Sequence, residues 1–231
     1  MNLFIANIGD DGSFFLDEDE TFHCIKSLRH QVGDTIHVTT GDGCVWTALI
    51  MSHTKKRTVL KCKNSSVTTP CPYSLHIAVA PTKNRSRIEQ FIEKAVEVGI
   101  QKITFIQCQR SEKKKINLER MNKIARSATK QSLKTYFTSI EDLTRFEDFV
   151  DNCTSAQKYI AHCNTSIEHR MTNYDAFDDC TILIGPEGDF SKDEIQYAIQ
   201  HGFKELNLGD ERLRTETAAL FATFFVNIAH K

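Results

Sequence analysis

The sequence predicts an α/β protein of two domains, a small β-barrel followed by a mostly parallel sheet with helices on both faces. Residues 1–70 contain short β-branched or alternating segments that are separated by turns rich in glycine and aspartate. In residues 73–231, short apolar strands alternate with segments of helical periodicity, as in βαβ units. With 231 residues and 40% apolar composition, the chain can bury one or two ordinary cores.

The first domain is expected to be built from strands, with one short helix. The expected strands cover residues 3–7, 35–39, 44–51 and 58–63, and the helix covers residues 20–30. Residues 64–72 contain serine, threonine and two prolines, which is typical of a linker.

The second domain is expected to alternate strands with helices. The helix at 85–98 has apolar residues on one face and ends at Gly99. The other expected elements are strands at 75–80, 102–108, 158–162, 182–184 and 206–208, and helices at 118–133, 141–150, from 191 and at 218–228. Such a sheet binds ligands at the carboxyl ends of its strands.

Composition limits the classes of function. The formal net charge is −1, so any surface that binds RNA must be locally basic. The eight cysteines form no CxxC pair, which favours reduced thiols in a cytoplasmic protein. No apolar run approaches the roughly 20 residues of a membrane span. The histidines form no HExxH pattern, so no metal is expected.

Two glycine-terminated strands mark the candidate site. The apolar run 182–184 stops at Gly-Pro-Glu-Gly, and a helix follows in which Ser191 and Glu194 can form a capping box. The run 206–208 also stops at a glycine, Gly209, and Leu-Arg-Thr-Glu-Thr-Ala then opens a long apolar helix. Two such loops would expose backbone groups at one place in the sheet.

Two interpretations of these loops remain open. In the first, the glycines are needed only for tight turns with positive φ. In the second, the loops bind a ligand. Glu187 and Asp189 would repel a phosphate, and there is no Gly-Lys-Ser/Thr run, so a nucleoside suits the loops better than a phosphate group does.

The two motifs resemble the signature of the RsmE-type ribosomal RNA methyltransferases of the SPOUT superfamily. The matching residues are Ile-Gly-Pro-Glu-Gly at 184–188, Ser-Lys-Asp-Glu-Ile at 191–195, Leu-Gly at 208–209 and Leu-Arg-Thr-Glu-Thr-Ala at 213–218. The resemblance implies a PUA-like barrel in the first domain, a deep trefoil knot in the second and a homodimer. The apolar final helix is consistent with a dimer, or with a helix at the centre of the monomer.

The resemblance also implies the activity. The family transfers a methyl group from S-adenosylmethionine (SAM) to N3 of one uridine in 16S RNA of the small ribosomal subunit, near the decoding centre. We therefore expect ribosomal RNA, within the assembled small subunit, as the partner. A transfer RNA methyltransferase of the same superfamily and a non-catalytic RNA-binding assembly factor are the alternatives.

The expected site residues follow from the motifs. Arg214 is expected to stabilise the uracil oxygens or a phosphate, and Glu216 to accept the N3 proton. The alternative is that the two side chains only pair with each other or with backbone groups at the start of the helix. The expected cofactor-binding residues are Leu183, Ile184, Gly185, Pro186, Glu187, Gly188, Leu208, Gly209, Leu213, Thr215, Thr217 and Ala218.

Basic residues indicate where RNA would bind. Five cations of the helix at 118–133 and its end share one face, which predicts a stripe that follows phosphates, although an ordinary charged face would look the same. The expected RNA-binding residues are Arg29, Lys83, Arg85, Arg87, Arg110, Arg120, Lys123, Arg126, Lys130 and Lys134. Lys134 stands where many members of the family have arginine. The lysine keeps the positive charge but lacks the planar guanidinium group that can bind a phosphate through two hydrogen bonds.

Overall fold

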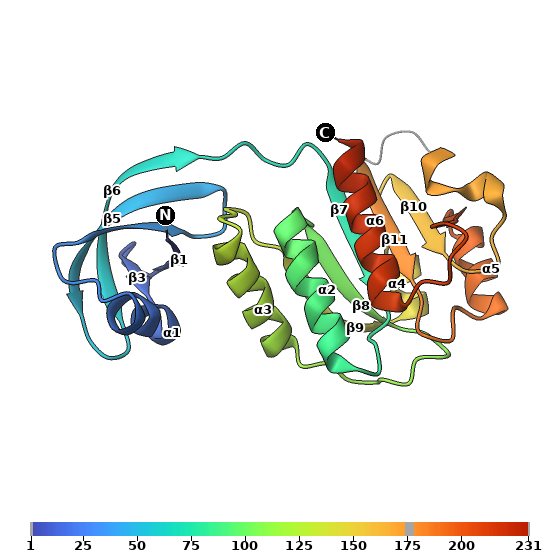
Figure 1. Cartoon of the computed structure of the whole chain (residues 1–231), viewed down its shortest axis with the longest axis horizontal. Coiled ribbons are helices and arrows are strands. Elements are labelled where there is room, and N and C mark those ends of the chain that lie inside the picture. Colours follow the sequence, from blue (N-terminus) through green and yellow to red (C-terminus); the bar gives the residue numbers. More distant parts are fainter. Residues whose placement is uncertain (1, 174–177, 231) are drawn as a thin grey trace. The chain divides into compact units, whose positions relative to one another are not determined.

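The computed structural model describes residues 2–173 and 178–230 and contains a mixed α/β fold with two sheets (Figure 1). The chain divides into two compact units. The first comprises Met1–Pro70 and Arg126–Phe137, and the second comprises Cys71–Ala125 and Thr138–Lys231. The segment Arg126–Phe137 thus packs with the first unit, whereas the sequence predicts it within the second domain.

Two glycines explain how the segment around Phe137 packs in the first unit. A Cβ atom on Gly41 would lie 2.1 Å from the Phe137 ring, and one on Gly43 would lie 2.3 Å from the Tyr136 ring. Two backbone hydrogen bonds, from Gly43 N to Thr135 O at 3.0 Å and from Phe137 N to Gly41 O at 3.1 Å, complete the contact. Only residues without a side chain allow this close approach.

The first unit contains a six-stranded sheet in the order β1-β4-β5-β6-β3-β2. Its strands are β1 (Leu3–Ile5), β2 (Asn7–Ile8), β3 (Phe14–Leu16), β4 (Thr35–Thr39), β5 (Cys44–His53) and β6 (Thr58–Val67). Only β1 and β4 pair in parallel. Phe4, Leu16, Val38 and Ile50 lie in its core.

Two boundaries in the first unit differ from the prediction. The helix expected at 20–30 is α1 (Glu18–Thr21), which continues as the π-helix η1 (Phe22–Ser27), and it begins where the Asp17 side chain accepts a hydrogen bond from Glu20 N. Strand β6 extends to Val67 because it pairs with β5 as far as Cys44. The expected linker at 64–72 is therefore shorter.

The second unit contains a six-stranded, fully parallel sheet in the order β12-β10-β11-β7-β8-β9. Its strands are β7 (Ser74–Val79), β8 (Lys102–Gln107), β9 (Ser139–Arg145), β10 (Gln157–Ala161), β11 (Asp179–Ile184) and β12 (Lys204–Leu206). Its helices are α2 (Arg85–Val98), α4 (Phe146–Asp151), α5 (Lys192–Gln200) and α6 (Thr215–Ala229), with short 3-10 turns η2 (Ile167–His169) and η3 (Met171–Asn173). The helix α3 (Leu118–Gln131) begins in this unit and ends in the first.

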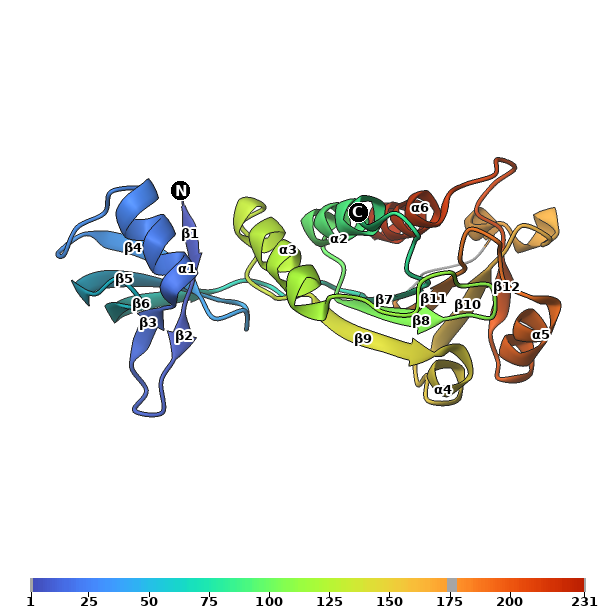
Figure 2. The ribbon, with the colours of Figure 1, turned by 90° about the horizontal axis from the view of Figure 1, so that it is seen from below.

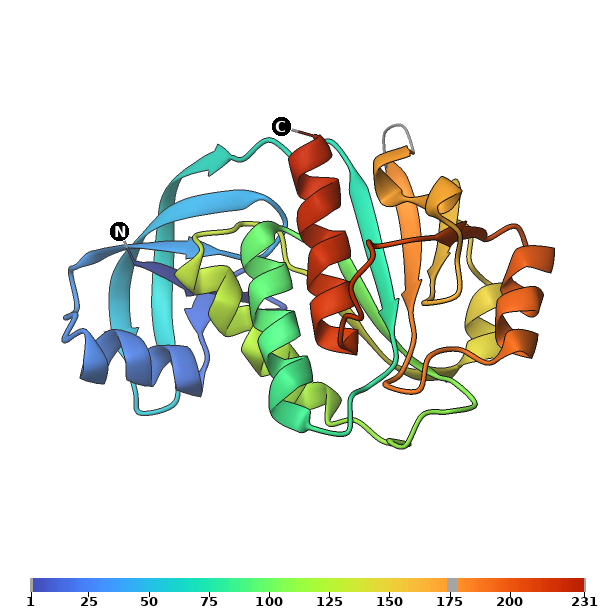
Figure 3. The same cartoon turned by 45° about the vertical axis from the view of Figure 1, so that its right-hand side comes forward.

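Helices cover both faces of the second sheet. Figure 2 shows α2 and α6 on one side of the strands and α4 on the other, and Figure 3 shows α2 and α6 side by side in front of them. Phe146 and Val150 of α4 pack with Ala198 of α5 and with the sheet residues Ile160 and Leu183 in one buried cluster. The parallel sheet is therefore buried between two layers, as its apolar strands predict.

Local sequence signals explain where two helices begin and end. The Asn84 side chain accepts a hydrogen bond from Ser86 N at the start of α2, and Gly99 adopts φ 110° after its last residue. Ser191 and Glu194 form the predicted capping box at the start of α5. Both helices therefore start where a side chain satisfies free backbone N–H groups.

One expected helix is wrong. Of residues 141–150, the first five belong to strand β9, and only α4 is helical. Ile140 is buried, and β9 pairs in parallel with β8 along its whole length. Edge pairing with β8 outweighs the weak helical pattern of this segment, which local propensity alone does not reveal.

Among the described residues, no helix is long and apolar enough to cross a membrane.

Candidate active site

The loops that contain Gly185 and Gly209 meet at one end of the second sheet. Strand β12 ends at Leu206, earlier than the expected strand at 206–208, so Asn207 and Leu208 lie between the strand and Gly209. Strand β10 lies between β11 and β12, so the carboxyl ends of these three parallel strands are neighbours. They border a cavity of about 370 Å³. The lining residues are Ala161, His162, Cys163, Ile184, Gly185, Pro186, Glu187, Asp189, Asn207, Leu208, Gly209, Glu211, Arg212, Leu213, Arg214, Thr215 and Ala218.

A buried hydrogen bond ties the two loops together. The Thr215 hydroxyl, at the start of α6, donates to the carbonyl oxygen of Gly185 at 2.9 Å. Thr215 is 5% exposed. A Cβ atom on Gly185 would lie 3.1 Å from the Phe190 ring, so the chain passes this ring closely. The tie fixes the end of β11 against the first turn of α6.

The cavity contains nine of the twelve expected cofactor-binding residues. They are Ile184, Gly185, Pro186, Glu187, Leu208, Gly209, Leu213, Thr215 and Ala218. The other three lie beside it. Leu183 is fully buried in β11, the Gly188 carbonyl accepts a hydrogen bond from Arg110, and Thr217 is exposed on α6.

The two expected catalytic residues lie in different surroundings. Arg214 lines the cavity and is the residue that precedes α6. Glu216 is absent from the cavity's described lining, and its Oε1 lies 3.7 Å from Nε of Arg87 on α2. Its Oε2 is buried and accepts no hydrogen bond from the described residues. The structure pairs Glu216 with Arg87, so a direct pair between Arg214 and Glu216 is not formed.

His162 is a cavity residue that the sequence patterns did not indicate. It follows strand β10, its side chain is 2% exposed, and its Nε2 lies 3.0 Å from Oε1 of Glu205. Its Nδ1 is buried and has no hydrogen-bond partner in the part of the chain that the structure describes. The one feature of the sequence that could have indicated His162 is its position directly after an apolar strand, β10, which lies between the two motif strands β11 and β12.

The loop that follows β10 is held by Asp189 to the loop that follows β11. Oδ2 of Asp189 accepts a hydrogen bond from Cys163 N at 3.0 Å, and Asp189 adopts φ 62°. Burial and the nearby Asp189 carboxylate raise the pKa of the Cys163 thiol. Cys163 is therefore protonated near neutral pH and is a poor nucleophile.

The cavity carries charges of both signs. Glu187, Asp189 and Glu211 bring three carboxylates to its lining, and Arg212 and Arg214 bring two guanidinium groups. Oε1 of Glu187 accepts a hydrogen bond from Lys83 N at 2.9 Å, which connects the first loop to the start of α2. This balance suits a ligand that bears both a cation and an anion, and it disfavours a polyphosphate.

The expected RNA-binding residues of the second unit are mostly paired with carboxylates. Lys83 lies 2.9 Å from Glu112, Lys123 lies 3.3 Å from Glu119, and Arg87 lies beside Glu216. Arg85 and Arg120 share Glu89. Arg110 donates from Nη1 to the carbonyls of Gly188 and Phe190 and so braces the first loop.

The remaining expected RNA-binding residues belong to the first unit. The ammonium group of Lys130 pairs with Glu20, and the Arg126 guanidinium lies 5.8 Å from the centre of the Phe137 ring. Arg29 is exposed with φ 62°, and Lys134 is half-buried. Within the expected cation stripe, Arg120, Lys123 and Lys130 each have a carboxylate partner from another turn or element, so the stripe is interrupted by acids.

No metal cluster is evident. Across residues 2–173 and 178–230, no group of three or more histidine, cysteine, aspartate or glutamate side chains is arranged to hold a metal ion. All eight cysteines are free.

Comparison with known proteins identifies relatives over almost the whole chain. The chain is 28% identical to the ribosomal RNA small subunit methyltransferase E of Buchnera aphidicola over 229 residues, which is 95% of this chain and 90% of the relative. It is 25% identical to the protein of the same name from Bacillus subtilis over 237 residues, covering 96% and 92% of the two chains.

Solved structures are also similar. A crystal structure described as a "probable rRNA-methyltransferase" from Porphyromonas gingivalis is 35% identical, with a TM-score of 0.89 and coverage of 100% of this chain and 98% of the other. A Legionella pneumophila structure with the bound cofactor SAM is 26% identical, with a TM-score of 0.85 and coverage of 99% and 96%.

The family model described as an RNA methyltransferase domain matches residues 69–227. This match includes all the described elements of the parallel sheet and both glycine-terminated loops. The chain therefore belongs to the RNA methyltransferase domain family.

Proposed function

We propose that this protein transfers the methyl group of SAM to N3 of a uridine in 16S RNA, near the decoding centre of the assembled small ribosomal subunit. The observation that carries the proposal is the cavity at the carboxyl ends of β10, β11 and β12, whose two motif loops are joined by Thr215 and Gly185. The relatives from Buchnera aphidicola and Bacillus subtilis bear the name of small-subunit RNA methyltransferases, and they match nearly the full chain.

The cavity residues fit SAM. Its volume, about 370 Å³, lies within the range of small-ligand sites, roughly 300–1,000 Å³. SAM is a nucleoside that carries a sulfonium cation and a zwitterionic amino acid, and the cavity offers carboxylates and guanidinium groups. The buried Nδ1 of His162, which lacks a partner among the described residues, is a polar atom that a ligand group can satisfy.

The proposed cofactor contacts come from both motif loops. Ile184 to Glu187 would contribute backbone groups from one side and Leu208, Gly209 and Leu213 from the other. Gly188 would complete the first loop, and Leu183 would support it from the core. Thr215 holds the loops together, and Thr217 and Ala218 lie on the first turns of α6. When bound, SAM supplies a methyl group already activated by its sulfonium.

The chain itself must position the uracil and remove its N3 proton. Arg214, at the edge of the cavity, would stabilise negative charge on the uracil oxygens. Glu216 is the proposed proton acceptor, because its buried Oε2 accepts no hydrogen bond from the described residues while Arg87 holds its Oε1. A target base must also leave its stack to reach the cavity.

RNA would be held by cations in each unit. In the second unit these are Lys83, Arg85, Arg87, Arg110, Arg120 and Lys123, and in the first they are Arg29, Arg126, Lys130 and Lys134. We propose that residues 1–70 form a PUA-like RNA-binding barrel and that residues 73–231 form the SPOUT methyltransferase domain. The sheet of the first unit supports this assignment, since barrel-like sheets present one face to RNA.

We propose that the chain after β12 is knotted, although knots are nearly absent from proteins in general. Asn207 forms a parallel bridge with Arg170 on one side of this segment, and Thr215 binds Gly185 on the other. The segment is thus bound to the chain that precedes β11 and to the chain that follows it. Such an arrangement supports a trefoil knot around the cavity.

A second copy of the chain is the proposed partner of α6. Phe221, Phe224 and Ile228 lie on one face of this helix and are 43%, 45% and 66% exposed. Apolar side chains grouped in this way mark interaction surfaces. A metal-free homodimer in the cytoplasm, where assembled small subunits occur, completes the proposal.

Methyl transfer to ribosomal RNA tests the proposed function. Small subunits and naked 16S RNA from a strain that lacks the gene would be incubated with SAM and the protein, and the modified nucleotide located by mass spectrometry. We expect one methylated uridine on the subunits. Methylation of transfer RNA instead, or no SAM binding by calorimetry, would refute the proposal.

The Arg214→Ala variant tests the role of this side chain. SAM affinity and turnover are measured separately. We expect the variant to bind SAM with nearly the affinity of the wild type and to turn over more slowly, because the uracil charge develops only during transfer. Unchanged turnover would remove Arg214 from the mechanism.

A further inference from the structure

A second cavity lies in the same unit as the candidate active site. Its volume is about 220 Å³, and it lies between the start of α2 and the segment that leads into α3. Ile88 and Met121, which are 4% and 2% exposed, form apolar walls together with Pro81. Arg85, Lys113 and Lys115 form its cationic lining. An apolar interior with a cationic edge matches a nucleobase that is flanked by phosphates.

The surroundings of this cavity have an excess of positive charge. A neighbouring cavity of about 430 Å³ shares Lys113 and Lys115 with it and adds Lys83, Lys114 and Glu112. The carboxylates beside these cations include Glu112, which pairs with Lys83, Glu187, which accepts from Lys83 N, and Glu89. Since the cations outnumber the carboxylates, the surface favours a polyanion.

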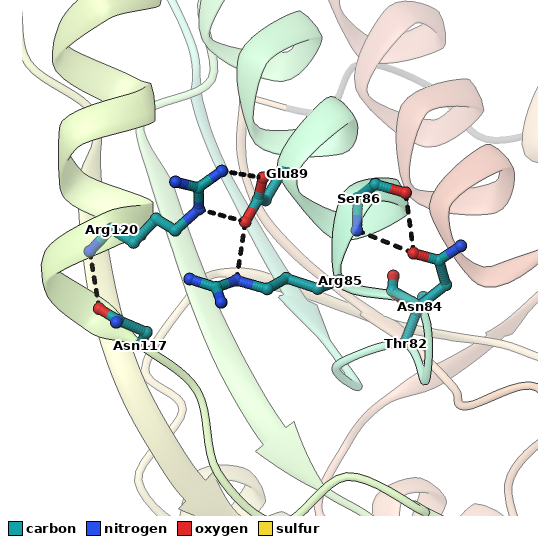
Figure 4. Close-up of polar contacts among 7 residues, drawn as sticks. All are labelled: Thr82, Asn84, Arg85, Ser86, Glu89, Asn117 and Arg120. Carbon is teal, nitrogen blue, oxygen red and sulfur yellow. Dashed lines mark hydrogen bonds and ion pairs between the residues drawn. The ribbon is translucent and has the colours of Figure 1, made fainter.

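Glu89 holds two arginines in position between α2 and α3, as Figure 4 shows. Its Oε2 accepts from Nη2 of Arg120 at 2.7 Å, and its Oε1 lies 2.8 Å from Nε of Arg85. The Glu89 side chain is 16% exposed, whereas those of Arg85 and Arg120 are about half exposed. Each guanidinium has five N–H donors, so both keep donors for phosphate oxygens after binding Glu89.

A short backbone segment connects this cavity to the larger one. Pro81 and Thr82 line the smaller cavity, and the next residue, Lys83, donates its N–H to Glu187, which lines the larger cavity. Residues 81–83 therefore join the lining of the smaller cavity to a residue that lines the larger one. An RNA strand with one base in the larger cavity would carry a neighbouring nucleotide past this segment.

We propose that the smaller cavity receives an unpaired RNA base close to the methylated uridine. Arg85 and Arg120 bind the phosphates beside it, and Glu89 is a positioning residue for both arginines. The volume is below the range of roughly 300–1,000 Å³ for drug-sized ligands, so it suits one base. This inference rests on the proposed function, because it requires an RNA substrate in the larger cavity.

The first test separates RNA binding from cofactor binding. Arg85→Ala and Arg120→Ala are each expected to raise the KM for RNA by about tenfold, the loss of one charged hydrogen bond, and to leave the SAM Kd unchanged. The slope of log KM against log salt should fall by about one for each arginine. Arg145→Ala is the control, because Arg145 is also exposed and paired with a carboxylate, Glu147.

The role of Glu89 is tested through the arginines. Glu89→Gln should raise the KM for RNA in the wild-type protein and should have no further effect in the Arg85→Ala, Arg120→Ala double variant. If Glu89→Gln raises the KM for RNA by the same factor in the wild-type protein and in the double variant, Glu89 does not act through the arginines and the positioning role is wrong. Thermal unfolding of each variant identifies any loss that comes from misfolding.

Base insertion is tested by combining protein and RNA changes. Ile116 is half-buried in the cavity lining, and Ile116→Trp would fill it. Abasic nucleotides are placed one at a time around the target uridine of a substrate that the wild type methylates. One abasic position should raise the KM for the wild type and have no effect on Ile116→Trp.

The possible outcomes distinguish this inference from the proposed function. If the wild type methylates no ribosomal RNA, the proposed function fails. If it methylates RNA but no abasic position matters, or if Ile116→Trp and both arginine variants keep the wild-type KM, base insertion is wrong. If these variants have a raised KM for assembled subunits and an unchanged KM for naked RNA, the cavity binds a ribosomal protein. That result would also overturn the inference.

Discussion

The hydroxyl of Thr215 and the carbonyl oxygen of Gly185 are joined by a hydrogen bond of 2.9 Å, although thirty positions separate them in the chain. Thr215→Val would keep the shape of the side chain and leave the buried carbonyl without this donor. We expect the free energy of unfolding to fall by about 1–3 kcal/mol and SAM to bind at least several-fold more weakly. Chemical denaturation and calorimetry measure the two effects.

Thr215→Ser is the matched control, because it keeps the hydroxyl. It should bind SAM nearly as well as the wild type. If Thr215→Val folds normally and binds SAM with wild-type affinity, the tie between the loops has no role in shaping the cavity.

The proposed proton acceptor can be tested by removing its carboxylate. Glu216→Gln retains a side chain of the same size, so the rate of methyl transfer should fall by about 10²–10⁴-fold. The assay is single-turnover methyl transfer with saturating SAM. A variant with the wild-type rate would show that Glu216 serves only to pair with Arg87.

Gly209 is expected to be required for its backbone conformation. Its φ is +127°, and a Cβ atom there would meet no atom within 4 Å, so the cost of Gly209→Ala comes from backbone strain. We expect a loss of about 1–3 kcal/mol in the free energy of unfolding and weaker SAM binding. Gly12→Ala, also at positive φ but in the first unit, is the control and should leave SAM affinity unchanged.

His76 should make stability depend on pH. Burial, with a smaller effect from the Lys102 charge, lowers the pKa of His76 from 6.5 to about 4. Below pH 6.5 the unfolded chain binds a proton more readily than the folded protein, so stability is lost as the pH falls towards 4 and is unaffected above 6.5. The loss should reach about 3 kcal/mol.

His76→Gln can keep the contact with Thr104, which lies 2.7 Å from Nε2 of His76, and cannot take up a proton in this range. Urea denaturation between pH 7 and 4 should therefore show a flatter dependence for the variant. Parallel curves for the two proteins would indicate that His76 is not responsible.

The exposed face of α6 should determine the oligomeric state. Phe224→Asp places a charge on the face that contains Phe221 and Ile228, and it should convert a dimer to a monomer because a buried unpaired charge is costly. Sedimentation equilibrium gives the mass. Ile199→Asp changes a similarly exposed apolar residue on α5 and should leave the dimer intact.

Periodicity and capping in the sequence predicted most of the second unit. Apolar periodicity and Gly99 predicted the extent of α2, and Ser191 with Glu194 predicted the start of α5. These signals act within a few residues and therefore survive in any tertiary context. Strand β9 was missed because its stability comes from pairing with β8, a partner more than thirty residues away in the chain.

The sequence by itself predicted the loops that contain Gly185 and Gly209, their meeting at one place in a parallel sheet, and nine expected cofactor-binding residues and Arg214 as residues that line the cavity. The tertiary structure decided which charges meet. It placed Glu216 beside Arg87, brought His162 into the cavity, and paired Glu89 with Arg85 and Arg120. The physical reason is range: backbone conformation and capping depend on neighbours in the chain, whereas ion pairs and cavities depend on side chains that only folding brings together.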